Sequence, residues 1–331
     1  MVFLIIIIGG LTRLTDSGLS MVDWQPILGI IPPLNNAQWI SVFNDYKLSP
    51  EFLYVNKNMS LDEFKYIFWW EWFHRFFARL IGIVFVFPFF YFFYKKYLNN
   101  FFYKRFAILF CLGLLQAFVG WWMVKSGLSS DPSVSQYRLA THLGVAFSIL
   151  GLLIWTILDL VGKRDVLESK ATVYHANTVT GLIFLTVIGG ALVAGLKAGL
   201  VYNTFPLMGE GMIPPDYFSV EPYWRNIFEN VPAVQFNHRI LAIITVLAIV
   251  SLCVYSHFFC KNEWLLKTIY VMTTLAILQF LLGVLTLVNF VPEGLAVAHQ
   301  FIGLCLFGTS VVISWDVSIP RRYSPSQANN I

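Results

Sequence analysis

The hydrophobic positions of this chain gather in long continuous runs, separated by short polar segments. A run of about 20 apolar residues is long enough to cross the hydrocarbon core of a membrane as a helix. Seven runs reach that length, and a shorter apolar segment precedes them. The pattern therefore predicts eight membrane helices, at residues 1–12, 70–95, 103–124, 138–161, 174–196, 236–257, 266–290 and 295–316.

The first segment, "MVFLIIIIGG", is too short for a complete span. It is apolar for about ten residues, half of what a membrane helix needs. It also lacks the basic region and the small-residue cleavage site of a signal peptide. A first helix truncated by a start downstream of the native one is the favoured interpretation, and a short re-entrant or tilted segment is the alternative.

Composition supports a polytopic, all-α membrane protein. The chain is 57% hydrophobic and 12% charged, with a mean hydropathy of +0.68. A soluble domain carries about 25% charged residues, so this chain has too few charges to build a soluble surface. The four cysteines form no C-x-x-C pair, which argues against a disulfide framework and against a zinc site.

The net charge of +4 is unevenly distributed along the chain. Basic residues follow the even-numbered helices, whereas the opposite loops are long and mildly acidic. By the positive-inside rule both termini lie in the cytoplasm, or in the matrix if the setting is mitochondrial, and the long loops lie outside. This charge pattern gives no support for nucleic-acid binding. The basic residues are Lys95, Lys96, Lys104, Arg105, Lys163, Arg164, Lys170, Lys261, Lys267, Arg321 and Arg322.

An internal repeat divides the chain into halves. The glycine pair at 9–10 recurs at 189–190, "EWFHR" recurs as "QFNHR", and "ATHLG" recurs as "AVAHQFIG". Each half contributes an even number of helices, so both copies have the same orientation in the membrane. The repeat predicts two four-helix bundles related by a pseudo-two-fold axis, at residues 1–165 and 166–331.

Four histidines occupy comparable positions of the two halves. His74, His142, His238 and His299 fall within the first predicted turns of the even-numbered helices, near the outer membrane face. A single histidine there is usually an interfacial residue, but two facing imidazoles in each apolar bundle suit axial ligation of haem. Zinc or copper would recruit further polar ligands. The pattern therefore favours two bis-histidine haem sites.

Arginines accompany these histidines. Arg75 and Arg239 directly follow two of them, Arg79 lies one turn beyond Arg75, and Arg138 lies four residues before the second histidine. An arginine at the outer face can bind a haem propionate through two hydrogen bonds. Contact with lipid headgroups is the alternative for each arginine.

The halves differ beside their first histidine. Glu71 lies three residues before His74, on one helical face, whereas the equivalent residue of the second half is Gln235. Likewise Arg138 is matched by Leu295. A desolvated carboxylate can serve as general acid or base, which favours chemistry in the first half only. A simple Glu71–Arg75 ion pair is the alternative.

Several motifs resemble those of the haem A synthases of alphaproteobacteria and mitochondria: "GGLTRLTDSGLSMVDW", "FKYIFWWEWFHR", "GWWMVKSGL", "YRLATHLG", "FNHR" and "AHQ". This resemblance implies oxidation of a methyl group of haem O to the formyl group of haem A, by successive hydroxylations, with water as the expected source of oxygen. It implies partners in haem O synthase, in cytochrome oxidase assembly factors and in an electron acceptor that the sequence does not identify. A homo-oligomer is compatible with it.

The resemblance also assigns the histidines. It implies that His74 and His142 hold substrate haem O in the first half, that His238 and His299 ligate haem b in the second, and that Glu71 is the essential acid. Some members carry a cysteine pair in the first external loop, which residues 13–68 of this chain lack.

Two other functions are open at this point. One is a di-haem electron-transfer protein of the b type, which predicts symmetric halves and is disfavoured by the Glu71–Gln235 difference. The other is a haem carrier that passes haem on unaltered. Recovery of the extracted haems after co-expression with a haem O synthase distinguishes the three.

Overall fold

The computed structural model describes residues 1–23, 28–129, 132–161 and 168–318, and these residues form helices without a β-strand. The predicted boundary at 165/166 and the basic residues Lys163, Arg164, Arg321 and Arg322 lie outside the described residues. The α-helices are α1 (Val2–Leu14), α2 (Asn36–Lys47), α3 (Pro50–Tyr54), α4 (Leu61–Tyr94), α5 (Asn100–Gly127), α6 (Gln136–Val161), α7 (Lys170–Gly195), α8 (Val231–Phe259), α9 (Glu263–Val288) and α10 (Glu293–Val317), with short 3-10 helices at Leu28–Ile30, Ala198–Leu200 and Tyr223–Ile227.

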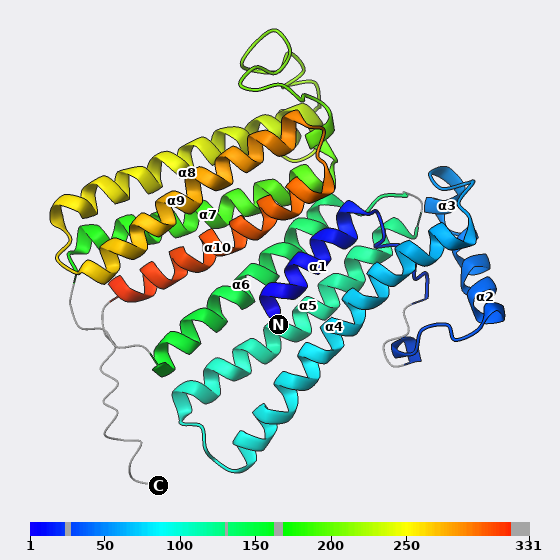
Figure 1. Ribbon diagram of the computed structural model, residues 1–331, viewed down its shortest axis with the longest axis horizontal. Coiled ribbons are helices and arrows are strands. Elements are labelled where there is room, and N and C mark those ends of the chain that lie inside the picture. The colour runs from blue at the N-terminus through cyan, green and yellow to red at the C-terminus, as the bar shows by residue number, and fades with distance from the viewer. Residues whose placement is uncertain (24–27, 130–131, 162–167, 319–331) are drawn as a thin grey trace.

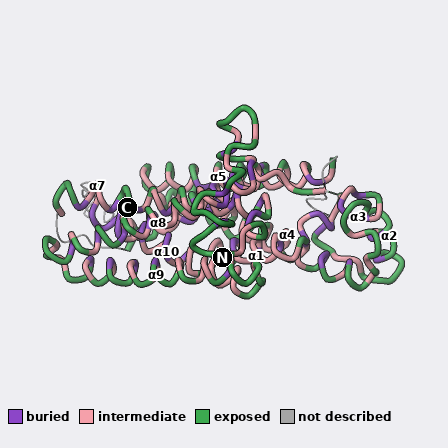
Figure 2. Tube along the Cα trace, turned by 90° about the horizontal axis from the view of Figure 1, so that it is seen from above, coloured by how far each residue is buried: buried purple, intermediate pink, exposed green. Residues whose placement is uncertain are grey.

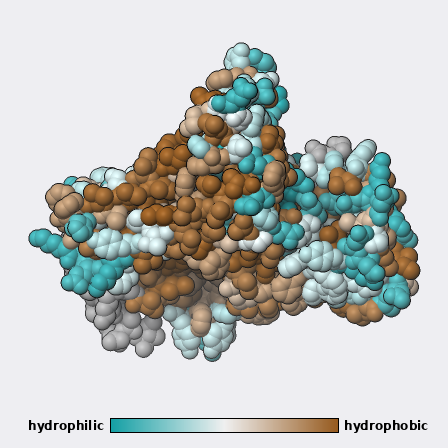
Figure 3. Space-filling model, turned by 45° about the horizontal axis from the view of Figure 1, so that its top comes forward, coloured by the Kyte–Doolittle hydropathy of each residue, from teal (hydrophilic) through white to brown (hydrophobic). Residues whose placement is uncertain are grey.

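The prediction of an all-α polytopic membrane protein is confirmed. Seven described helices, α4 to α10, are long and apolar enough to cross a membrane. The apolar window of α4 is only 6% buried inside the protein, so most of its side chains face outward, where lipid can cover them. Figure 3 shows this apolar surface over the helices, with hydrophilic residues at the projecting ends. The thirteen residues of α1 extend about 20 Å at 1.5 Å per residue, less than a full span.

The structure corrects the predicted start of the second membrane helix. α4 begins at Leu61 because Ser60 and Glu63 form a capping box, in which each side chain bonds the other residue's backbone N–H. His74 therefore lies 13 residues into its helix instead of in the first turn. The outer part of α4 supports α2 and α3, two helices within a segment that the sequence predicted only as a loop.

The membrane helices form two groups (Figure 1). α1, α4, α5 and α6 lie together, and α7 to α10 lie beside them. α6 contacts α7 and α10, and α1 contacts α6 and α10, so these four helices form the seam between the groups. At the seam the rings of Phe147 and Phe307 meet edge to face at 5.1 Å.

Residues at equivalent positions of the repeat meet at the outer end of this seam. Arg13, at the end of α1, donates hydrogen bonds to the carbonyls of Ala194 and Gly195, the last residues of α7. Lys197 bonds to Asp16 at 2.9 Å. Arg13 and Ala194 are 181 positions apart, as are Asp16 and Lys197. These contacts join the helix ends of the two groups at nearly the offset of the sequence repeat.

α2 and α3 form a subdomain at the N-terminal end of α4, set apart from the main body in Figure 2. Its aromatic core packs against Phe64, Ile67 and Phe68 of α4. At its centre the fully buried Tyr46 donates a 2.9 Å hydrogen bond to Glu51, whose side chain has no ion-pair partner among the described residues. Burial raises the pKa of Glu51 to about 7, and the nearby charge of Glu71 acts in the same direction.

The raised pKa of Glu51 predicts a pH-dependent stability of this subdomain. Between pH 4.5 and about 7 the folded subdomain holds a proton that the unfolded chain has released. The stabilisation from Glu51 is therefore fully present below pH 4.5 and is lost as the pH rises through 7, by on the order of 3 kcal/mol. Hydrogen exchange of α2 and α3, corrected for intrinsic rates, should accelerate from pH 5 to 8. Glu51→Gln should remove that dependence, and a wild-type profile in this variant would contradict the assignment.

Candidate functional site

The four predicted histidines lie on four different helices. His74 is on α4, His142 on α6, His238 on α8 and His299 on α10. His74 lies within electrostatic reach of His142, and His238 lies within reach of His299. The structure therefore brings the histidines together in two pairs, one in each group of helices.

Each histidine ring lies against a glycine of the preceding membrane helix. A Cβ added to Gly9 of α1 would lie 3.2 Å from Nε2 of His74, and one added to Gly120 of α5 would lie 3.0 Å from Cε1 of His142. The glycines of α7 and α9 lie equally close to the histidine rings of α8 and α10. No side chain therefore separates the helix backbone from the imidazole. The corresponding distances are 3.2 Å for Gly189 and Gly190 against His238, and 2.9 Å for Gly283 against His299.

A glutamine accompanies the second histidine of each pair. Gln116 donates to Nε2 of His142 at 3.2 Å, and Gln279 donates to Nε2 of His299 at 3.3 Å. Because an amide nitrogen only donates, the accepting Nε2 has no proton, which is the form that ligates a metal. In both cases the glutamine lies four residues before the glycine that contacts the ring.

These pairs fit haem as the ligand. Among the residues that the structure describes, no group of three or more His, Cys, Asp or Glu side chains could hold a metal ion. Each site offers two imidazoles in apolar surroundings, a donor set that suits axial ligation of haem. Buried Nδ1 atoms of His142 and His238 have no hydrogen-bond partner, so the pockets retain polar atoms that the protein does not satisfy.

Glu71 lies beneath the loop that follows α1, beside the first pair. The loop donates to Oε2 through the Ser20 hydroxyl at 2.7 Å and the Met21 amide at 2.8 Å. Arg75 donates to Oε1 at 2.5 Å and to the Met21 carbonyl at 3.0 Å. Glu71 is 2% exposed, and its carboxyl oxygens accept hydrogen bonds from three donors.

The second half contains a similar arrangement with different chemistry. Gln235 donates to the carbonyls of Ala198 and Tyr202 and accepts from Arg239 at 3.0 Å. Arg239 also donates to the Tyr202 carbonyl at 2.8 Å. An amide at this position can therefore bind both the loop and the arginine. The ionisable side chain of Glu71 is what distinguishes the first half.

Of the other predicted arginines, Arg138 lies on α6 and Arg79 lies on α4. Arg138 donates to the Trp122 carbonyl at 2.6 Å and its guanidinium lies 4.5 Å from the Trp122 ring centre. Arg79 is half-buried on α4, one turn beyond Arg75. The Nη1 atom of Arg75 and the Nε atom of Arg239 are buried without a partner, so both guanidinium groups retain donors for an anionic ligand.

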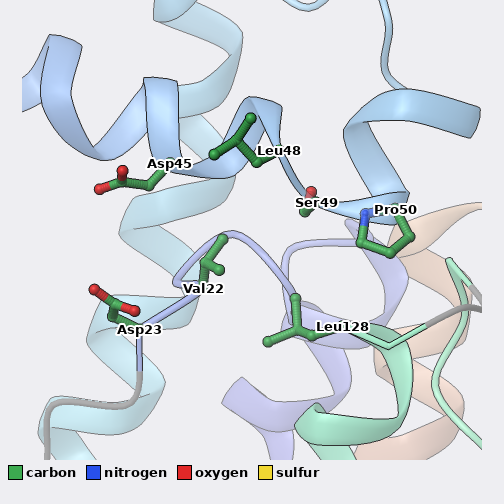
Figure 4. Close-up of a pocket in the computed structure, with 7 residues that line it drawn as sticks. All are labelled: Val22, Asp23, Asp45, Leu48, Ser49, Pro50 and Leu128. Atoms are coloured by element: carbon green, nitrogen blue, oxygen red, sulfur yellow. The ribbon is translucent and has the colours of Figure 1, made fainter.

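A small cavity lies between the loop that contains Val22 and Asp23 and the end of α2 (Figure 4). It measures about 260 Å³ and is bounded by this loop, by the subdomain of α2 and α3, and by Leu128, the residue after α5. Its acidic residues, Asp23 and Asp45, come from the loop and from α2. No histidine lines this cavity.

Sequence reasoning missed the glutamines and the role of the glycines. The signal was present as "QAFVG" at 116–120 and "QFLLG" at 279–283, which recur in α5 and α9 as the histidines do in the even-numbered helices. Only the packing of neighbouring helices links those glycines to the histidine rings.

Fold and site together define a polytopic membrane protein with one buried histidine pair in each of two similar groups of helices. The chain belongs to the cytochrome oxidase assembly protein family COX15-CtaA, whose family model matches residues 1–311. Among its relatives are proteins named heme A synthase. That of Nitrosospira multiformis is 41% identical over 321 residues, covering 96% of this chain and 90% of the relative. That of Parvibaculum lavamentivorans is 43% identical over 319 residues, covering 94% and 89%.

The glycine contacts predict which helix positions tolerate a methyl group. Gly120→Ala should displace His142, since the added Cβ would lie 3.0 Å from its ring, and should lower haem bound by the first pair several-fold. Gly113→Ala on the same helix is the matched control, because nothing lies within 4 Å of its Cβ. Haem per chain, measured after purification, provides the comparison. Equal haem loss in both variants would contradict a specific glycine–histidine contact.

Proposed function

We propose that this chain is a haem A synthase, an oxidoreductase that converts a methyl group of haem O into the formyl group of haem A for cytochrome oxidase assembly. Two observations support this together: the chain is 41–43% identical to proteins of that name over most of its length, and it carries two buried histidine pairs. The pairs account for two haem groups, one as substrate and one as resident cofactor.

In this proposal the two halves have different tasks. His74 and His142, in residues 1–165, hold substrate haem O, whereas His238 and His299, in residues 166–331, hold haem b. The buried carboxylate of Glu71 lies only in the first half, and the equivalent amide of Gln235 cannot exchange a proton. Haem b, when bound, supplies a one-electron redox centre beside the substrate site.

Glu71 is assigned the proton transfer. Converting a methyl to a formyl group with one water as the oxygen source releases four protons and four electrons, so a nearby base is required. The carboxylate is on the same face of α4 as His74, one turn earlier, and its contacts with Ser20 and Met21 fix its orientation. The four electrons pass to an external acceptor, and the protons pass outward past the loop.

Arg75, Arg79 and Arg138 in the first half and Arg239 in the second are assigned to the haem propionates. The unpartnered Nη1 of Arg75 and Nε of Arg239 support this role. The proposal places the protein in the bacterial inner membrane, with both termini cytoplasmic and the haem sites near the outer face. Its partners are haem O synthase, which supplies the substrate, and cytochrome oxidase assembly factors, and self-association is compatible with it.

The assignment of the pairs predicts selective haem loss. His74→Ala and His142→Ala should remove haem O while haem b remains, and His238→Ala and His299→Ala should remove haem b. The haems are extracted from purified protein after co-expression with a haem O synthase and identified by chromatography. If only haem b and unaltered haem O are ever recovered from the wild type, the chain is an electron-transfer protein or a carrier and the enzyme assignment fails.

The role of Glu71 is tested by Glu71→Gln, which copies the second half. Haem b should be retained, while haem A formation should fall about 100-fold, the usual contribution of a general acid or base. Glu71→Asp should recover part of the rate because it restores an ionisable group. Glu63→Gln on the same helix is the matched control, since a capping box accepts glutamine. Normal conversion by Glu71→Gln would reduce Glu71 to a partner of Arg75.

A further inference from the structure

Aromatic rings join α4 to α5 near the C-terminal end of α4. In Figure 1 α5 lies between α6 and α4. The rings of Phe93 and Tyr103 stack at 5.1 Å, and those of Phe85 and Phe106 lie 6.4 Å apart. The two helices are antiparallel, so the part of their interface nearer the first histidine pair is formed by residues before Phe85 and after Phe106.

Small residues face each other along that part of the interface. Gly82 and Ala78 lie three and seven residues before Phe85, on the same face of α4. Gly113 and Ala117 continue the aromatic face of α5 at the same helical spacing. All four small residues are exposed. Among the described residues, nothing beyond the helix's own backbone lies within 4 Å of a Cβ added to either glycine, so α4 and α5 leave an opening between them here.

The second half has larger side chains at two of these positions. Gly82 corresponds to Val246 of α8 when the first histidines of the two halves are aligned. Ala117 corresponds to Phe280 of α9 when the glutamines beside the second histidines are aligned. Both of these larger side chains are only partly exposed. The Phe280 ring meets that of Phe205, in the loop between α7 and α8, at 5.9 Å.

The buried core shows the same difference between the halves. Ala276 of α9, the counterpart of Gly113, is 2% exposed and belongs to the main core of the molecule. Among the described residues that core includes α1 and α6 to α10 but no residue of α4 or α5. The apolar windows of α4 and α5 are 6% and 11% buried, against 22% and 17% for α8 and α9. The interface of α8 with α9 is therefore closed where that of α4 with α5 is open.

The opening leads to the first histidine pair. His74 lies four residues before Ala78, on the same face of α4. Gly120 lies three residues after Ala117 on α5, and a Cβ added there would lie 3.0 Å from Cε1 and 3.5 Å from Nδ1 of His142. That Nδ1 atom is buried without a partner. A ligand that passes between the two helices therefore reaches both imidazoles.

We propose that the substrate haem enters and leaves the first site sideways from the lipid, between α4 and α5. This inference rests on the proposed function, since a substrate site must take up and release haem whereas a resident haem must stay. A haem is flat and largely apolar, and its two carboxylates lie along one edge. Its apolar edges can pass Gly82 and Gly113 without leaving the hydrocarbon, while the carboxylates stay toward the arginines.

Closing the opening with residues of the second half tests the proposal. Gly82→Val copies α8, and Ala117→Phe copies α9. The full-length protein, loaded by co-expression with a haem O synthase, is reconstituted in phosphatidylcholine vesicles. Excess protein-free vesicles then take up the haem O that leaves, and vesicles containing haem O supply it again. Each variant should slow both release and uptake about tenfold, because passage must displace the added side chain.

Cys111→Phe is the matched control for the larger side chain. Cys111 is exposed on α5 and lies two residues from Gly113, so a ring added there points away from the opening. Its exchange of haem O should equal that of the wild type. Phe280→Ala is the reciprocal change, which opens the interface of α8 with α9 and should accelerate release of haem b.

Rates and final occupancy together decide the outcome. An entry route sets the rates of uptake and release but leaves the final haem O content per chain unchanged. Unchanged rates in both closing variants, faster release with a lower haem O content, or equal slowing in Cys111→Phe would each overturn the proposal. The measurement needs no conversion, so failure to form haem A would refute the proposed function and leave this result standing. Absence of haem O at the first pair of the wild type would refute both.

Discussion

The structure depends on close approach between each histidine and the preceding membrane helix. An imidazole in an apolar bundle needs space beside a helix backbone, and only a glycine provides it without a cavity elsewhere. Gly9, Gly120 and Gly283 do this at single positions, and α7 uses a glycine pair. This requirement fixes the spacing of neighbouring helices and hence the place of each histidine pair. The packing of the helices and the geometry of the site therefore depend on the same contacts.

Because the two halves repeat the same arrangement of loop, polar side chain and arginine, the positions at which they differ are informative. Both halves hold an external loop over the start of a histidine-bearing segment by means of a buried polar side chain and an arginine one turn later. In the second half the amide of Gln235 makes the equivalent contacts, so a carboxyl group at position 71 is not needed for the fold. Gln300 is a second exception, in which α10 carries an amide where α6 carries Leu143. Both differences fall beside the paired histidines, Glu71 three residues before His74 and Gln300 directly after His299.

The sequence was sufficient for several features because they depend on one segment at a time. Run length predicted the membrane helices, since a helix in lipid must satisfy its own backbone and cover itself with apolar side chains. The recurrence of histidines in the two copies of the repeat predicted the histidine pairs that the structure brings together. The start of α4 was placed nine residues too late because its outer turns are amphipathic and their burial comes from α2 and α3.

By itself the sequence determined the class of protein, the membrane helices and the residue types of the two sites, because local hydrophobicity and an internal repeat encode them. Only the tertiary structure decided which atoms meet. Gly9 and Gly10 read as a copy of Gly189 and Gly190, yet in space one faces His74 and the other faces Gln300. The reason is that the repeat relates the sequences of the two halves but not the side chains that meet across the seam, so each contact there depends on both partners.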